Sequence, residues 1–133
     1  MGTRSVTIIK DEQGQTVAVM YRQFDGYLSG HGAELKALLA GHEVVNGYGI
    51  QDPETTHNGA GCLAASVVCH FKGQELHRLG GIYLAPAGTG WEEQEYVYEL
   101  TVVAGEAIRV RVSNWGELVY EGVLEEMPTE DPE

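Results

Sequence analysis

Alternating apolar and polar positions mark two strands near the start of the chain. Residues 5–10 (SVTIIK) and 15–23 (QTVAVMYRQ) are rich in β-branched side chains, and the polar segment 11–14 (DEQG) lies between them. Two such runs joined by a short glycine-containing turn are typical of a β-hairpin. Because side chains alternate across a strand, Tyr21 and Arg22 are expected to point to opposite faces of the sheet.

Two helices are expected after the hairpin. Residues 33–40 place three leucines on one stripe, which predicts a short amphipathic helix. Residues 62–72 (CLAASVVCHFK) are small or apolar around most of the circumference, which is typical of a buried helix. Between the helices, residues 42–50 predict either a brief strand or an irregular connection, and residues 51–61 are mostly loop formers.

The remaining pattern predicts strands separated by turns. A short strand is expected at residues 81–85, followed by a meander with strands at 95–103, 108–112 and 117–124. The order of strands, helices and strands predicts an α+β fold. In this fold an antiparallel sheet, made of the N-terminal hairpin and the C-terminal meander, carries two helices packed on one face.

The chain is expected to form a single α+β domain over residues 1–125. A chain of 133 residues can bury roughly two-thirds of the surface that it exposes when unfolded. Residues 126–133 are acidic and contain two prolines and no basic residue. This composition predicts a disordered tail.

The composition limits the expected location and partners. No apolar run approaches the roughly 20 residues of a membrane helix, and the N-terminus lacks the pattern of a secretion signal. Without a membrane helix or a secretion signal, no membrane partner is predicted. The two cysteines lie too far apart along one helix to form a disulfide, which predicts reduced thiols and a cytoplasmic protein. A net charge of −12 argues against direct nucleic-acid binding. An acidic surface can engage a basic groove on a protein, or it can simply be solvated.

The segment 21–32 (YRQFDGYLSGHG) is the first candidate binding site. Arg22 can grip a carboxylate or phosphate through two parallel hydrogen bonds, and the imidazole of His31 can donate, accept or shuttle a proton. Asp25 lies between them, and Gly32 allows close approach of the backbone to a ligand. The alternative is structural, with Asp25 starting a turn and pairing with Arg22, and with the glycines beginning the helix.

The start of the second helix is another candidate site. Asn58, Gly59 and Gly61 lie there in the sequence HNGAG, where free backbone N–H groups at a helix N-terminus can receive an anion. The alternative is a flexible loop in which Asn58 caps the helix. The functional interpretation joins segments 21–32 and 57–61 in one pocket for a small anionic, nucleotide-like ligand.

No metal site and no cofactor is predicted. None of the candidate ligands shows the short paired spacing of a zinc site; they are His31, His42, His57, Cys62, Cys69, His70 and His77. The cysteines are expected to be unreactive packing residues of an apolar helix. Binding is favoured over catalysis because no activated nucleophile is evident. If the protein is an enzyme, Asp25 and His31 are the candidate general acid and base of a small hydrolase.

Arg109 and Arg111 lie on one face of a predicted strand and form a small basic stripe. The stripe could hold an anionic ligand. The favoured interpretation is cross-strand pairing with one or more glutamates, the candidates being Glu95, Glu99, Glu117 and Glu121.

Several short segments carry a resemblance to a known family. They are GTRS, YRQFDGYLSGHGAEL, GCLAA, CHFK and GGIYLAP with a tyrosine-rich strand after it. In these segments the chain resembles a family of small uncharacterised proteins of phages, prophages and scattered bacterial and archaeal genomes, over most of the chain up to about Tyr98. It departs at Leu28, where the family pattern DGYPxGHG has proline, a change that alters loop rigidity and leaves the polar residues in place. The resemblance implies no established activity, only a setting in mobile elements, where counter-defence proteins are a common class.

The leading functional prediction is a phage or mobile-element accessory protein that binds a small anionic, nucleotide-like ligand in the host-cell cytoplasm, in a role such as counter-defence. One alternative is an acidic protein-binding inhibitor or nucleic-acid mimic, of the anti-CRISPR or anti-nuclease type, with a host defence protein as partner. The second alternative is the small hydrolase. Exposed edges of the predicted sheet also make a homodimer a reasonable expectation.

Overall fold

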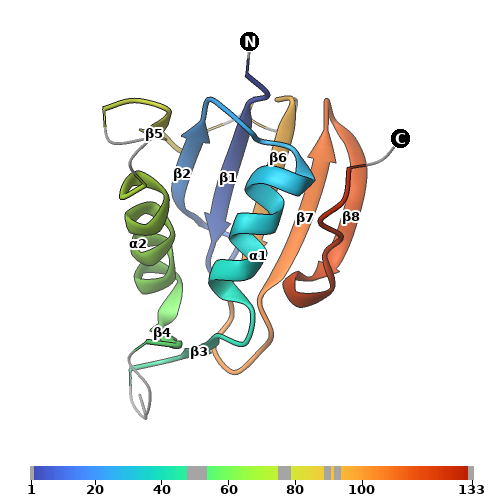
Figure 1. The fold of residues 1–133 in the computed structure, drawn as a ribbon. Coiled ribbons are helices and arrows are strands. Elements are labelled where there is room, and N and C mark those ends of the chain that lie inside the picture. Colours follow the sequence, from blue (N-terminus) through green and yellow to red (C-terminus); the bar gives the residue numbers. More distant parts are fainter. Residues whose placement is uncertain (1, 48–53, 75–78, 89–90, 92–93, 132–133) are drawn as a thin grey trace.

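The computed structural model describes residues 2–47, 54–74, 79–88, 91 and 94–131 (Figure 1). The helices and strands follow one another in this order: β1 (Ser5–Lys10), β2 (Thr16–Arg22), α1 (Ala33–Leu39), β3 (Glu43–Val45), β4 (Thr56–Asn58), α2 (Gly59–Lys72), β5 (Ile82–Ala85), β6 (Tyr96–Thr101), β7 (Arg109–Asn114) and β8 (Glu117–Val123). A π-helical turn at Leu28–Gly32 leads into α1, and a 3-10 turn at Leu124–Glu126 follows β8.

Six of the described strands form one sheet in the order β5-β2-β1-β6-β7-β8. The N-terminal hairpin and the meander β6–β8 are antiparallel, as predicted. They join through β1 and β6, which run parallel from the pair Ser5–Tyr96 to the pair Lys10–Thr101. The α+β fold with a mostly antiparallel sheet is therefore confirmed. The parallel pair departs from the all-antiparallel expectation, because distant segments form it and no hairpin turn sets its direction.

A second, two-stranded parallel sheet connects the two helices. β3 lies in the segment whose structure was left open, and it pairs with β4, which was predicted to be loop. α2 begins at Gly59, three residues before the predicted start. Both differences arise where glycine and asparagine suggested a loop, and the pairing with β3 outweighs those local preferences. The predictions for residues 48–53 lie outside the described residues.

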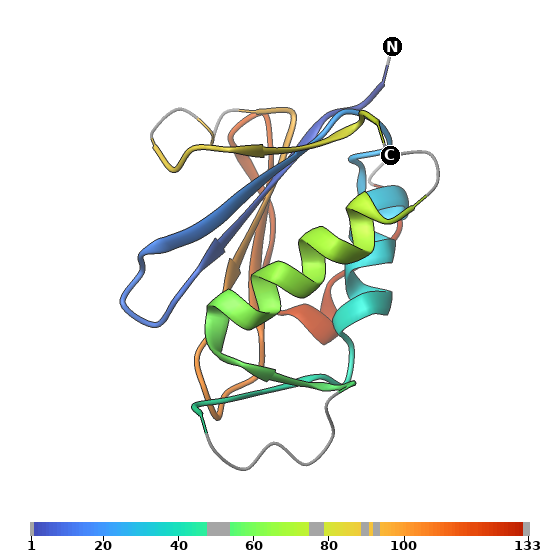
Figure 2. The ribbon, with the colours of Figure 1, turned by 90° about the vertical axis from the view of Figure 1, so that its left-hand side faces the viewer.

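Both helices pack on one face of the six-stranded sheet, as predicted (Figures 1 and 2). The main core lies between these layers and includes Met20, Leu63, Val67, Phe71 and Leu100. A smaller apolar cluster on the other face contains Val6, Ile8, Val19 and Val97, with Tyr21 packed against it. Tyr21 and Arg22 therefore do face opposite sides, and Arg22 is the one that enters the layer between sheet and helices.

The segment predicted as a disordered tail is packed as far as Asp131. Met127 is fully buried, and its carbonyl oxygen accepts a hydrogen bond from Lys36 Nζ at 2.8 Å. Asp131 accepts hydrogen bonds from the backbone N–H and the hydroxyl of Ser29. The prediction was wrong for residues 126–131, because the burial of one methionine and these contacts offset the acidic composition.

Candidate functional site

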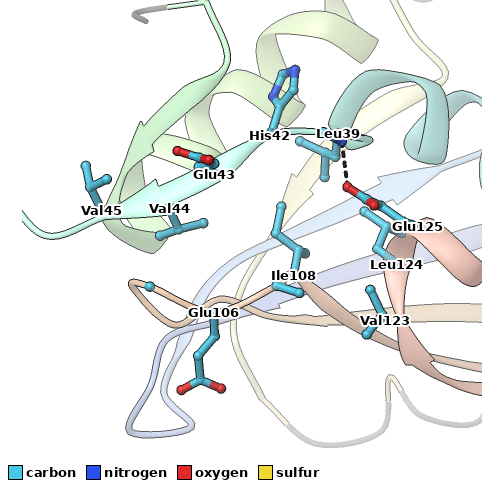
Figure 3. Close-up of a pocket in the computed structure, with 13 residues that line it drawn as sticks. Leu39, His42, Glu43, Val44, Val45, Glu106, Ile108, Val123, Leu124 and Glu125 are labelled. Carbon is cyan, nitrogen blue, oxygen red and sulfur yellow. Dashed lines mark hydrogen bonds between the residues drawn. The ribbon is translucent and has the colours of Figure 1, made fainter. Parts of the chain in front are cut away.

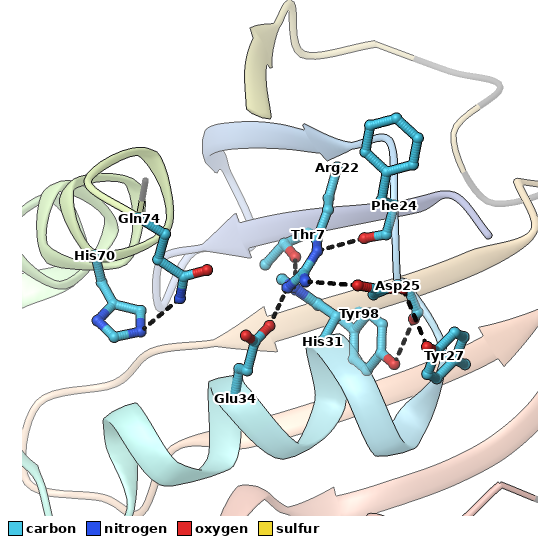
Figure 4. Close-up of polar contacts among 11 residues, drawn as sticks. Thr7, Arg22, Phe24, Asp25, Tyr27, His31, Glu34, His70, Gln74 and Tyr98 are labelled. Carbon is cyan, nitrogen blue, oxygen red and sulfur yellow. Dashed lines mark hydrogen bonds and ion pairs between the residues drawn. The ribbon is translucent and has the colours of Figure 1, made fainter. Parts of the chain in front are cut away.

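The loop after β2 delivers His31 into the core. The side chain is fully buried, and its ring lies 4.7 Å from the ring of Phe71 and 4.8 Å from that of Tyr98, between centroids. Nε2 is 2.7 Å from Thr7 Oγ1, and Nδ1 is 3.3 Å from Arg22 Nη1 (Figure 4). Both ring nitrogens therefore have protein partners, which leaves no route for this imidazole to contact a ligand.

Arg22 is buried as well, with 3% of its side chain exposed. Its Nε donates to the carbonyl oxygen of Phe24 at 2.5 Å, and its Nη1 forms an ion pair with Glu34 on α1. Nη2 lies 4.0 Å from Asp25 Oδ2, and the guanidinium carbon is 5.6 Å from the centroid of the Phe71 ring. An anion at this guanidinium would have to displace the carboxylate of Glu34.

Asp25 lies at the surface beside a shallow hollow of about 480 Å³. Tyr27 and Glu34 also line this hollow, and the Tyr27 hydroxyl donates to Asp25 Oδ1 at 3.0 Å. That hydrogen bond and the charge of Asp25 raise the pKa of Tyr27, with smaller contributions from burial and from Asp131. Arg22 lines the same hollow and opposes this shift, so its charge is offset there by the carboxylates of Asp25 and Glu34.

Packing explains two glycines of this loop. A Cβ atom on Gly30 would lie 2.4 Å from the carbonyl oxygen of Asp25, a distance that real Cβ atoms do not reach. A Cβ atom on Gly32 would lie 3.3 Å from the hydroxyl oxygen of Tyr98, which is already a tight contact. The glycines let the π-helical turn sit close to the sheet, so their presence needs no ligand.

The second predicted candidate lies at the other end of α2. Gly59 opens the helix with φ of +82°, and Gly61 has open space around it. Asn58 precedes the helix, yet its side chain accepts a hydrogen bond from the Gly47 N–H at 2.7 Å and caps no α2 group. Phe71, which contacts Arg22, is twelve residues along α2 from Gly59, about 18 Å at 1.5 Å per residue. Segments 21–32 and 57–61 therefore do not share one small pocket.

The predicted metal candidates that the structure describes do not converge, and His77 lies outside the described residues. Among the described residues, no group of three or more His, Cys, Asp or Glu side chains could hold a metal ion. His42 and His57 instead form a pair, with His42 Nδ1 2.8 Å from His57 Nε2. Burial lowers the pKa of His57, and the proximity of His42 adds to this effect.

The cysteines are not packing residues. α2 turns Leu63, Val67 and Phe71 inward and leaves both Cys62 and Cys69 exposed. The prediction of a helix buried on nearly all sides was wrong here, because α2 covers the sheet with one face only.

The basic stripe on β7 is used in cross-strand pairing. Arg111 Nε lies 3.6 Å from Glu121 Oε2 on β8, one of the predicted partners. Arg109 is exposed in the same row and lies opposite Thr101 on β6.

An acidic cleft of about 510 Å³ opens where the C-terminal end of α1, β3 and the turn before β7 meet (Figure 3). Its floor is apolar and includes Leu39, Val44, Ile108 and Leu124, all buried. Three exposed glutamates, Glu43, Glu106 and Glu125, lie among its lining residues together with His42. No lysine or arginine is found among these lining residues.

Hydrogen bonds join the segments that form the walls of the acidic cleft. The Gly41 N–H donates to Glu125 Oε1 at 2.7 Å, and the Gly105 N–H donates to the carbonyl oxygen of Val44 at 2.9 Å. The Leu124 N–H donates to the carbonyl oxygen of Ile108 at 2.8 Å. The walls of the cleft thus come from three separate segments of the chain that these hydrogen bonds connect. Sequence reasoning missed it because each glutamate is ordinary in its own segment.

Comparison of the chain with protein-family models, with curated proteins and with solved structures found no significant match. The resemblance to the phage and prophage family stays a prediction. Within the described residues, no helix is long and apolar enough to cross a membrane.

Proposed function

We propose that the protein is a binding protein whose acidic cleft receives a basic segment of another protein. The observation that carries the proposal is that Glu43, Glu106 and Glu125 all lie among the described lining residues of one cleft with an apolar floor, and that no lysine or arginine does. Figure 3 shows the carboxylate of Glu106 at the outer side of the cleft, directed away from Val44. A lysine or arginine of a partner can lay its aliphatic stem on the floor while its charged end stays near the glutamates. The net charge of −12 adds long-range attraction for a basic partner.

This proposal takes up the protein-binding alternative from the sequence. In a mobile-element setting, the partner would be a basic host defence protein, and the protein would act as an inhibitor or nucleic-acid mimic. The anionic, nucleotide-like ligand has weaker geometric support, since Arg22 already pairs with Glu34, and Asp25 and Glu34 line the same hollow as Arg22. The hydrolase has weaker support too, since His31 is buried while Asp25 is exposed.

The test uses a short peptide of alternating lysine and leucine as the probe, with binding measured by calorimetry and mapped by amide chemical shifts. The variant combines Glu43→Gln, Glu106→Gln and Glu125→Gln, because glutamine keeps the size of each side chain and an acceptor for Gly41. The matched control combines Glu12→Gln, Glu117→Gln and Glu130→Gln, three exposed acids that do not line the cleft. Both variants carry the same net charge.

The cleft variant is expected to bind the probe about tenfold more weakly, and the control variant less than about threefold more weakly. Shift changes should centre on β3 and on the turn before β7. Equal weakening in both variants would mean a general charge effect and would overturn the proposal. Absence of binding to the wild-type protein at low salt would overturn it as well.

A further inference from the structure

The two edges of the six-stranded sheet differ in charge. β8 forms one edge and carries Glu117 and Glu121, the latter paired with Arg111. β5 forms the other edge and carries no charged residue. Charged side chains on an edge strand oppose pairing with another strand, so β5 is the edge that is open to it.

The side chains of β5 are unusually exposed for apolar groups. Leu84 is 69% exposed and Tyr83 is 48% exposed. Leu84 points to the helix-covered side of the sheet, because it pairs with Met20 of the main core, and Tyr83 points to the opposite side beside Tyr21. An added strand would therefore cover apolar surface on both faces.

A hollow of about 520 Å³ lies next to this edge, between α2 and the strands β2 and β5. Figure 2 looks onto this side of the molecule, where α2 lies beside the sheet and in front of α1. The lining residues are small or apolar except for one lysine; they are Val17, Ala18, Gly61, Ala64, Ala65, Val68, Cys69, Lys72 and Leu84. Among the residues that the structure describes, no acidic one lines this hollow.

The backbone of β5 offers hydrogen-bonding groups in a defined register. The Gln23 N–H donates to the Gly81 carbonyl at 2.8 Å, so in the alternation of an antiparallel pair Tyr83 also bonds to β2. Ile82 and Leu84 then direct their N–H and C=O groups outward. Lys72 Nζ donates to the carbonyl oxygen of Ile82 at 3.1 Å, and Pro86 has no N–H.

We propose that two copies of the chain pair through β5, antiparallel about a twofold axis at Leu84, to form a dimer with a continuous sheet. In this register, Leu84 of each copy exchanges both backbone hydrogen bonds with Leu84 of the other. Ile82 lies opposite Pro86, which has no N–H to donate, so Lys72 can keep its bond to the Ile82 carbonyl. The two leucines meet beside the hollows, and the exposed face of α2 around Ala65 and Cys69 flanks the seam.

Charge explains why a second copy fits this surface. Two chains of net charge −12 repel each other wherever their acidic surfaces meet. At this edge β5 carries no charged residue, and the described residues that line the adjoining hollow include no acid, so copies can approach there with less repulsion than at the acidic surfaces. The surface is also self-complementary, because Leu84 lies at the rim of the hollow that it would help to fill. The acidic cleft is lined by none of these residues and stays accessible in the dimer.

Sedimentation velocity over a concentration series tests the proposal, with Leu84→Glu as the variant and Leu118→Glu as the matched control. Leu118 is 53% exposed on the opposite edge strand. The wild-type protein should show a concentration-dependent dimer. Leu84→Glu should weaken dimerisation at least about tenfold, and Leu118→Glu less than about threefold. A wild-type protein that stays monomeric up to about 1 mM, or a dimer that only Leu118→Glu dissociates, would overturn the proposal.

Cross-linking of native cysteines provides a measurement that needs no change at Leu84. Cys69 lines the hollow and Cys62 does not, although both are exposed on α2. With a bis-maleimide reagent, the Cys62→Ser variant, which keeps Cys69, should form covalent dimers in higher yield than the Cys69→Ser variant. Equal or reversed yields would place the seam elsewhere and would count against the twofold axis at Leu84.

Discussion

At the scale of single residues, Arg22 shows how this fold accommodates a charge in its interior. The guanidinium is desolvated, and it is balanced by Glu34 and bonded to the carbonyl oxygen of Phe24 and to His31. Removing the guanidinium would take one partner from His31, which is buried, and from Glu34, which is partly exposed, and breaking a buried charged contact usually costs more than the contact itself contributes. Arg22 is therefore a structural residue whose loss should be felt in folding.

We expect Arg22→Met to lower the free energy of unfolding by about 3 kcal/mol, because Glu34, His31 and the Phe24 carbonyl each lose a partner. Urea denaturation followed by fluorescence measures the change. Arg109→Met is the control, since Arg109 is exposed, and it should change stability by less than about 0.5 kcal/mol. Equal stability of Arg22→Met and the wild-type protein would make Arg22 a ligand-binding candidate again.

At the scale of elements, the short sheet β3–β4 is joined by a hydrogen bond between two histidines. His42 Nδ1 and His57 Nε2 lie 2.8 Å apart, so one nitrogen must carry a proton and the other must not. Protonation of both rings would place two N–H groups against each other. The junction between α1 and α2 is therefore sensitive to pH.

The direction in which the stability changes with pH follows from the pKa shift of His57. Its pKa is lowered in the folded protein, first by burial and then by His42, so the unfolded chain binds a proton first as the pH falls. The stability that neutral His57 contributes is fully present above the unfolded pKa of about 6.5 and is lost as the pH falls below it. The difference in melting temperature between wild type and His57→Gln should therefore shrink from pH 7.5 to pH 5.

The matched control is His70→Gln, because His70 is exposed on α2. The difference in melting temperature between His70→Gln and the wild-type protein should vary less over the same pH range. A wild-type advantage over His57→Gln that grows on acidification would contradict the expected sign. Calorimetric melting of the three proteins at four pH values provides the measurement.

The elements also show what the sequence could predict. The hairpin β1–β2, the inward face of α1 and the meander β6–β8 follow from local periodicity, because each repeats its pattern over six or more residues. β4 spans Thr56–Asn58 within a polar stretch, and only its pairing with β3 makes it a strand. The parallel pairing of β1 with β6 joins segments about 90 residues apart, which no local pattern specifies.

The candidate site was harder to predict than the fold. Arg22, Asp25 and His31 are predicted as site residues because three side chains capable of polar chemistry lie close together in the sequence. In the fold, however, Arg22 and His31 are buried in the core and hydrogen-bond to each other. Chemically versatile side chains serve burial as well as binding, and a sequence does not separate the two uses. The acidic cleft is the opposite case, because no single segment of the sequence indicates it. Its glutamates lie in three separate segments, and only the fold brings these segments together.

At the scale of the whole molecule, the excess of acidic residues works against folding and for association with a basic partner. There are 20 acidic and 8 basic residues. The described ion pairs Lys10–Glu99 and Arg111–Glu121 are partly or largely exposed, and such pairs contribute little. Repulsion among carboxylates should therefore dominate the electrostatic part of the stability.

The dependence of stability on salt tests this balance and links it to the acidic cleft. Dissolved NaCl, chiefly through its sodium ions, screens repulsion between carboxylates beyond about 10 Å at 0.1 M, so raising NaCl from about 0.02 to about 0.2 M should raise the melting temperature by about 3 °C. The cleft variant with Glu43→Gln, Glu106→Gln and Glu125→Gln changes the net charge from −12 to −9. It should melt at a higher temperature than the wild-type protein at low salt, and its melting temperature should respond less to added NaCl, as measured by calorimetry.

A higher melting temperature of the cleft variant would mean that the three glutamates lower the stability of the fold, as expected of residues retained for binding. A cleft variant that melts lower at every salt concentration would instead make these glutamates structural, with Glu125 bound to Gly41 as the first contact to examine.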